Sequence, residues 1–159
     1  MTKRQCFPCT ACCEGWLGAD TEEIKLSVNK PCVNCTNHRC GIYETRPVDP
    51  CRNFKCAWLA KDSPLPEEMK PIDCGAIVLL DYAWHDRKVV SAIPTGKNIP
   101  KETLEWLMNY ARNKPIPLIF VEHFFEDGKY NGYKRTGYGP PSFIQAVNTE
   151  IDSEDTFMM

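Results

Sequence analysis

The sequence lacks any apolar run long enough to cross a membrane. Its longest candidates, Ala76–Leu80 and Pro117–Val121, are the size of single strands, whereas a spanning helix needs about 20 apolar residues. An excess of positive charge is also missing, because 19 Lys and Arg face 21 Asp and Glu, for a formal net charge of −2. General nucleic-acid binders are usually basic, so we expect neither a membrane protein nor a general nucleic-acid binder.

Motifs for nucleotide binding and hydrolysis are absent as well. The chain has no glycine-rich phosphate loop, no dinucleotide fingerprint and no His-Glu-x-x-His helix. His85 falls in an expected turn and His123 in an expected strand, where surface or core histidines are the ordinary interpretation. Asp81 is interpreted as a charge at a hairpin edge. We therefore assign no catalytic residue and lean away from an enzyme.

Cysteine is the residue in excess. The chain has ten, and nine of them lie between Cys6 and Cys56. Residues 1–5 lead into Cys6 without the apolar segment and cleavage site of a secretory leader, so we expect a cytoplasmic protein. Disulfides are rare in that compartment, which makes metal binding the favoured use of the thiols and a disulfide scaffold the alternative.

The cysteine spacing is typical of metal sites. Cys6, Cys9, Cys12 and Cys13 follow the pattern C-x2-C-x2-C-C, in which a C-x2-C turn directs two thiolates at one ion. Adjacent side chains diverge, so Cys12 and Cys13 are better suited to two different metals or to two corners of a cluster. A second group contains another C-x2-C pair, a nearby histidine and three further cysteines: Cys32, Cys35, His38, Cys40, Cys51 and Cys56.

These motifs, with the segment Cys40-Gly41-Ile42-Tyr43-Glu44-Thr45-Arg46-Pro47 and the pattern Cys51-Arg52-x-Phe54-x-Cys56, resemble the CxxCxxCC family over residues 6–59. Members of that family are described as zinc- or iron-chelating cysteine-cluster proteins. The resemblance implies eight metal ligands: Cys6, Cys9, Cys12, Cys13, Cys32, Cys40, Cys51 and Cys56. Cys35 is extra to the family pattern and Cys74 lies outside it, so Cys35, His38 and Cys74 are additional candidates, and the choice between Cys32 and Cys35 stays open.

The metal is zinc or an iron–sulfur cluster, with zinc slightly favoured. Paired C-x2-C ligands suit structural zinc, whereas the three-cysteine run and the vicinal pair suit a cluster. A flagellin lysine methylase with a similar motif is an iron–sulfur case by resemblance. Clustered thiolates repel one another unless cations neutralise them, and Arg39, Arg46 and Arg52 are placed to donate hydrogen bonds to sulfur. Metal ions are the expected partners, and a protein partner is left open.

The role that we expect is non-catalytic metal chelation or structural metal binding. The alternative is an iron–sulfur redox or enzyme-accessory protein that uses the same cysteines. The basic and aromatic stretch Lys129–Tyr138 resembles single-strand binding surfaces, but a tyrosine-rich hairpin around Asn131-Gly132 is the favoured interpretation.

The expected fold class is α+β. We divide the chain into a cysteine-cluster module over residues 1–60, a proline-rich connector over 61–73, an α+β half over 74–150 and an acidic tail over 151–159. The module should be irregular and stapled by metal, because it has no clear apolar period, and should pack with a small antiparallel sheet and one or two helices. In the α+β half we expect the following elements: a hairpin of Ile77–Trp84 and Lys88–Ile93, a helix over Pro100–Arg112, a strand over Ile116–Phe125 and a helix near Ser142–Val147.

Overall fold

The structure, a computed structural model, describes residues 4–6, 9–22, 24–28, 30–36 and 39–149. His38 and the acidic tail lie outside the described residues. The expected α+β class is confirmed, with 26% of the chain in helices and 34% in strands. Within the described part of the chain, no helix is both long and apolar enough to cross a membrane.

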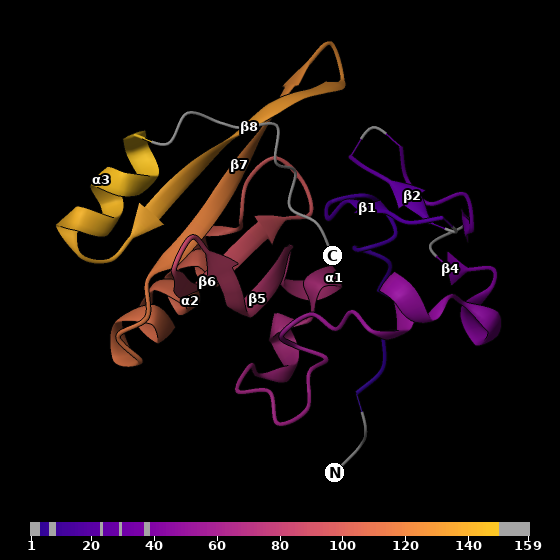
Figure 1. Ribbon diagram of the computed structural model, residues 1–159, viewed down its shortest axis with the longest axis horizontal. Helices are drawn as coiled ribbons and strands as arrows, with labels where there is room; N and C mark the ends of the chain where they lie inside the picture. The colour runs from indigo at the N-terminus through magenta and orange to yellow at the C-terminus, as the bar shows by residue number, and fades with distance from the viewer. Residues whose placement is uncertain (1–3, 7–8, 23, 29, 37–38, 150–159) are drawn as a thin grey trace.

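A four-stranded sheet, in the order β5-β6-β7-β8, forms the centre of the fold (Figure 1). Its first two strands, β5 (Ala76–Trp84) and β6 (Arg87–Pro94), pair as an antiparallel hairpin, as predicted. His85 lies in the two-residue turn between these strands and takes a positive φ of 53°, so its position is explained by the turn. The hairpin contributes a continuous set of buried aliphatic side chains, which are Ile77, Val78, Val89, Val90 and Ile93.

The expectation of a purely antiparallel sheet is wrong at its centre, because β6 and β7 (Leu118–Glu126) are parallel. Helix α2 (Lys101–Asn113) connects these two strands, and a crossover helix returns the chain so that the next strand runs in the same direction. The helix follows Pro100, as predicted, and buries Leu107 and Ala111 in the core.

The predicted hairpin at Asn131-Gly132 is also wrong, since both residues lie inside strand β8 (Lys129–Tyr138). The turn between β7 and β8 falls on Asp127-Gly128, where φ is 52° and 77°. Helix α3 (Pro141–Thr149) follows and packs against β8. Its buried residues join a small cluster on the sheet that consists of Trp84, Val89, Ile119, Phe143 and Val147.

The N-terminal part has little regular structure and lies on the side of the sheet away from α3 (Figure 1). It contains two minimal antiparallel pairs, β1 (Ala19–Asp20) with β2 (Lys25–Leu26) and β3 (Cys35–Thr36) with β4 (Arg39–Cys40). Short helical turns follow: η1 (Tyr43–Thr45), the π-helical η2 (Val48–Arg52), η3 (Glu67–Met69) and α1 (Pro71–Cys74).

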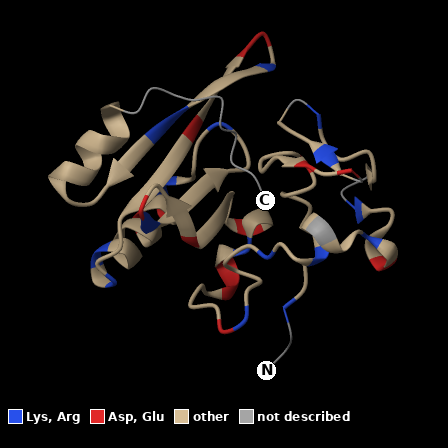
Figure 2. Cartoon of the chain, viewed as in Figure 1, with Lys and Arg blue, Asp and Glu red and all other residues tan. Residues whose placement is uncertain are grey.

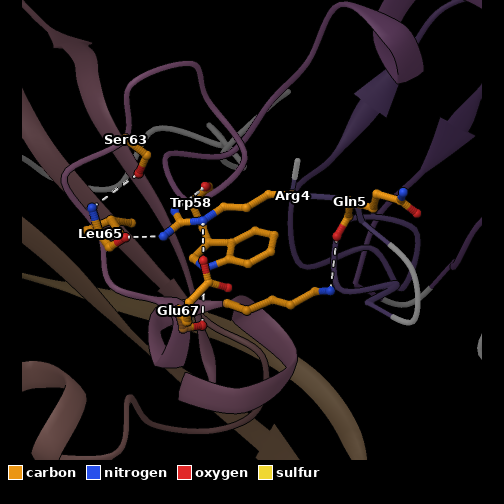
Figure 3. A network of polar contacts seen from close by, with 7 residues as sticks. Arg4, Gln5, Trp58, Ser63, Leu65 and Glu67 are labelled. Atoms are coloured by element: carbon orange, nitrogen blue, oxygen red, sulfur yellow. Dashed lines mark hydrogen bonds and ion pairs between the residues drawn. The ribbon is translucent and has the colours of Figure 1, made fainter. Parts of the chain in front are cut away.

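Trp58 and Arg4 attach this irregular part to the rest of the fold. The Arg4 guanidinium donates to the carbonyls of Trp58 and Leu65, at 2.8 and 2.7 Å, and forms an ion pair with Glu67 (Figure 3). It also lies over the Trp58 ring, 4.7 Å from the centroid. Because the Trp58 indole is 5% exposed and donates to the Glu67 carbonyl, these contacts hold the start of the chain against residues 58–67.

Two further contacts join the cysteine-rich part to the sheet. The Ala57 N–H donates to the Val78 carbonyl of β5 at 2.7 Å. Trp16 packs on His123 of β7, with ring centroids 5.3 Å apart, and burial lowers the pKa of His123 from its usual 6.5. His123 is therefore a buried core histidine, which agrees with the interpretation made from its place in a strand.

Candidate metal centre

All eight cysteines implied by the family resemblance line one cavity of about 130 Å³ in the N-terminal part. They come from four separate places in the chain, namely the loop over residues 6–13, the segment before β3, strand β4, and η2 with the residues after it. The eight are Cys6, Cys9, Cys12, Cys13, Cys32, Cys40, Cys51 and Cys56. The fold thus brings together thiols that are up to 50 positions apart in the sequence.

Apart from Thr10 and Tyr43, the remaining walls of the cavity are apolar or basic. Phe54, Trp58 and Leu59 line it together with Ile24 and Leu26. Three cationic side chains also reach it, those of Arg39, Arg46 and Lys70. Soft sulfur donors, apolar walls and nearby positive charge together favour a thiolate-bound metal over a site for a hard, oxygen-preferring cation.

The thiols converge without forming a closed coordination shell. Across the described ranges, no three His, Cys, Asp or Glu side chains form a group that could hold a metal ion as they stand. Metal sites commonly form together with the folding of the segment that carries them, and this segment has only two-residue strands and short turns among its described residues.

Burial favours the protonated form of five of the eight cavity thiols by raising their pKa. It raises the pKa of Cys6, Cys51 and Cys56, and it raises that of Cys12 well above the usual range. For Cys13 the pKa rises from 9.0 to about 12, chiefly through burial and then through the neighbouring cysteines. The cluster is costly to ionise unless a cation compensates for the charge.

The three additional candidates, Cys35, His38 and Cys74, differ in their positions relative to the cavity. Cys74 is buried at the end of α1, and its Sγ lies 3.3 Å from the carbonyls of both Met69 and Ala76. Burial raises its pKa to about 11, and it does not line the cavity. Cys35 lies opposite Cys40 in the β3–β4 pair, also outside the cavity lining, whereas His38 is not among the described residues. Cys32 is thus better placed than Cys35 as a ligand.

The three arginines predicted to support the cluster have different environments. Arg39 and Arg46 line the cavity, and Arg46 lowers the pKa of Cys6 against the dominant effect of burial. Arg52 is exposed, and its guanidinium donates to the Glu44 carbonyl at 3.0 Å. Sequence reasoning missed Lys70, whose ammonium lies over the Trp58 ring and donates to the Gln5 carbonyl. No motif marks Lys70, because it reaches the cavity from the connector.

Basic and acidic residues are interspersed over the part of the chain that the structure describes (Figure 2). Lys and Arg alternate with Asp and Glu along the ribbon in Figure 2, and the β7–β8 turn carries both signs. In β8, Lys134 lies opposite Glu122 and Lys129 lies opposite Glu126. Two of the three basic residues of Lys129–Tyr138 therefore have acidic neighbours across the strand pair, and the third, Arg135, lies opposite Val121.

Comparison of the chain with family models, with curated proteins and with solved structures finds no match.

Proposed function

We propose that this chain is a cytoplasmic, non-catalytic metal-binding protein whose cysteine cluster chelates zinc or an iron–sulfur centre. One observation carries the proposal: the eight cysteines selected by motif resemblance all line a single cavity. A set of thiols chosen by sequence pattern alone has no reason to share a cavity unless the pattern serves a common site.

The chemistry of the cavity supports a structural role for the metal. Thiolates bind Zn²⁺ and iron–sulfur clusters in preference to Mg²⁺ or Ca²⁺. Arg39, Arg46 and Lys70 lie where they would offset the negative charge that remains on a metal–thiolate group. The surrounding segment has only two-residue strands and short turns, so metal binding would supply much of its order.

An iron–sulfur redox or accessory role is the second candidate, favoured by the apolar walls of the cavity. Phe54, Trp58 and Leu59 line it and belong to the main core or pack against it, and solvent exposure is one of the features by which proteins set the potential of such clusters. The consecutive C-x2-C-x2-C run of Cys6, Cys9 and Cys12 suits a cluster equally well.

Anaerobic purification with metal analysis, visible absorption and free-thiol counting tests both candidates. Zinc with a colourless protein supports the first, and iron with sulfide and a brown colour supports the second. Cys9→Ser and Cys51→Ser should each bind less metal, whereas Cys74→Ser is the matched control that retains it, because its thiol lies outside the cavity. A colourless, metal-free protein with all its thiols oxidised would overturn the proposal.

A further inference from the structure

We infer that the eight thiols form two separate four-thiolate sites, Cys6, Cys9, Cys12 and Cys56 in the first and Cys13, Cys32, Cys40 and Cys51 in the second. The inference rests on the proposed function and assigns each ligand to a site. The vicinal pair Cys12-Cys13 is the boundary between the two.

The first set is built on a tight turn that faces the main core. The Cys9 N–H donates to the Cys6 carbonyl at 2.6 Å, which closes the C-x2-C loop. Cys9 and Cys12 pack against the main core, to which Cys56 and Trp58 belong. Cys56 is 9% exposed and precedes the backbone contact with β5. This set therefore lies where the cysteine-rich part meets the sheet.

The second set surrounds a small satellite core of its own. Cys32 is buried there with Ala19, Ile24 and Leu26, and Cys13 and Cys51 pack against the same cluster. The Cys32 N–H donates to the Cys13 carbonyl at 2.9 Å, which brings these two distant residues together. None of the residues of this satellite cluster appears in the main core.

Electrostatic neighbours divide the thiols in the same way. The cysteines that raise the pKa of Cys12, after burial, are Cys56, Cys13, Cys9 and Cys6. Those that raise the pKa of Cys13 are Cys35, Cys40, Cys32 and Cys51. Cys56 is influenced by Cys6 and Cys9, and Cys51 by Cys32 and Cys40. Among the thiols whose pKa is shifted, the covalently adjacent pair couples one set to the other. Packing places Cys9, Cys12 and Cys56 in the first set and Cys13, Cys32 and Cys51 in the second, while the Cys6–Cys9 turn and the β3–β4 pair carry Cys6 and Cys40 with them.

Cys35 is a fifth thiol beside the second set. It is bonded through its N–H to the Cys32 carbonyl, lies opposite Cys40, and has a hydrogen bond with the Thr10 side chain. Because it does not line the cavity, it is placed as a reserve ligand. We expect Cys35 to replace a lost partner in the second site and to have no such role in the first.

Chemistry explains why a division into two groups of four is favourable. Four thiolates complete the tetrahedral shell of one Zn²⁺, or hold the four corners of one cubane cluster. Each zinc tetrathiolate carries two negative charges. In the first set, Arg46 and Lys70 lie close enough to Cys6 to offset these charges. Five or six thiolates on one ion would exceed this coordination number and leave excess charge.

Cadmium substitution of the reduced full-length chain tests the division without any mutation. ¹¹³Cd–¹H correlation should show two cadmium signals, one coupled to the Cys β-protons of the first set and the other to those of the second. A single signal coupled to cysteines of both sets, or bridging thiolates that couple to two ions, would overturn the partition. A wild-type chain that binds no cadmium would instead defeat the proposed function.

Native mass spectrometry of zinc-loaded variants provides the second measurement. Cys12→Ser should lose one zinc and retain the second site, whereas Cys13→Ser should retain both ions, because Cys35 supplies the missing thiolate. Cys13→Ser combined with Cys35→Ser should then hold one. Cys74→Ser is the control and should hold two. If Cys12→Ser bound no zinc, or if Cys13→Ser combined with Cys35→Ser still held two zinc ions, the two-site assignment would fail.

Discussion

Zinc binding should release about four protons per site from the reduced, metal-free protein at pH 7. Each thiol must lose its proton before it can coordinate a metal. An ordinary thiol has a pKa near 8.5 and is about 97% protonated at pH 7. Burial raises the pKa of Cys12 well above the usual range and that of Cys13 to about 12, so these two thiols hold a full proton.

The size of the effect follows from the same shifts. A rise from 9.0 to about 12 at Cys13 makes its ionisation costlier by roughly 4 kcal/mol, at about 1.36 kcal/mol for each pKa unit. The metal has to offset this cost when the thiolate forms. With four thiols per site, the apparent affinity should rise by about four orders of magnitude for each pH unit over the range where all four are protonated.

Calorimetric titration measures this release directly. Zinc is added in two buffers whose ionisation enthalpies differ, and the difference in heat gives the number of protons released. We expect about eight for the fully loaded chain and the same number for Cys74→Ser, whose buried thiol lies outside the cavity. Release of only one or two protons per zinc would mean that few thiols bind, and would refute the tetrathiolate assignment.

Three further predictions concern stability. Because the pKa of the Cys13 thiol is raised in the folded state, its contribution to the stability of the metal-free fold is fully present below pH 9 and is lost as the pH rises towards 12. The urea unfolding midpoint of the metal-free protein, but not that of the metal-bound protein, should therefore fall between pH 8 and pH 10. A constant midpoint would contradict the burial of the thiols. Gly15→Ala should lower the free energy of unfolding by at least about 2 kcal/mol, because φ at Gly15 is +94° and an added Cβ would meet the Ser27 carbonyl oxygen at 1.9 Å. Gly96→Ala is the control, since an added Cβ there would meet nothing within 4 Å. Equal melting temperatures for the two variants would refute this prediction. Arg4→Ala should lower the free energy of unfolding by about 1–3 kcal/mol, because it leaves two carbonyls unpaired. Glu67→Gln removes only an exposed ion pair and should lower it by less than about 1 kcal/mol. Similar losses for the two variants would show that the carbonyl contacts contribute little.

Elements with a clear apolar period could be predicted from the sequence. The amphipathic spacing of Leu104, Leu107, Met108 and Ala111 located α2 to within a residue at each end. The parallel pairing of β6 and β7 could not be predicted in the same way, since it depends on where the helix returns the chain. Local period does not contain that information.

Turn chemistry was ambiguous for a specific reason. Asp127-Gly128 and Asn131-Gly132 are both favourable pairs for a two-residue hairpin turn, and they lie four residues apart. The observed turn pairs Glu126 with Lys129 and lets β8 continue to Tyr138 beside β7. The longer strand pairing decides the choice, and this is a tertiary property.

The candidate site shows the same limit at the level of single residues. Motif resemblance selected eight cysteines that share a cavity, but spacing could not rank Cys32 against Cys35, which lie on one turn. Their environments do rank them: Cys32 is 9% exposed and lines the cavity, whereas Cys35 does not line it and has a hydrogen bond with the Thr10 side chain. Both thiols pack with Ile24 and Leu26, Cys32 as a buried member of that cluster and Cys35 as a partly buried neighbour, so it is the degree of burial and the cavity lining that rank them, and the motif contains neither.

The vicinal pair Cys12-Cys13 lies where the two proposed thiolate groups meet. Two adjacent residues direct their side chains apart, and here each carbonyl is engaged on a different side: Cys12 accepts from Gly15, and Cys13 accepts from Cys32. Gly15 allows this turn because its positive φ brings the backbone onto Ser27. One loop can therefore serve both thiolate groups, with the boundary between them at the Cys12–Cys13 peptide bond. A glycine inserted between them should leave each group with its own cysteine but remove the shared geometry, so that the ¹¹³Cd signals of the two sites persist while their positions shift.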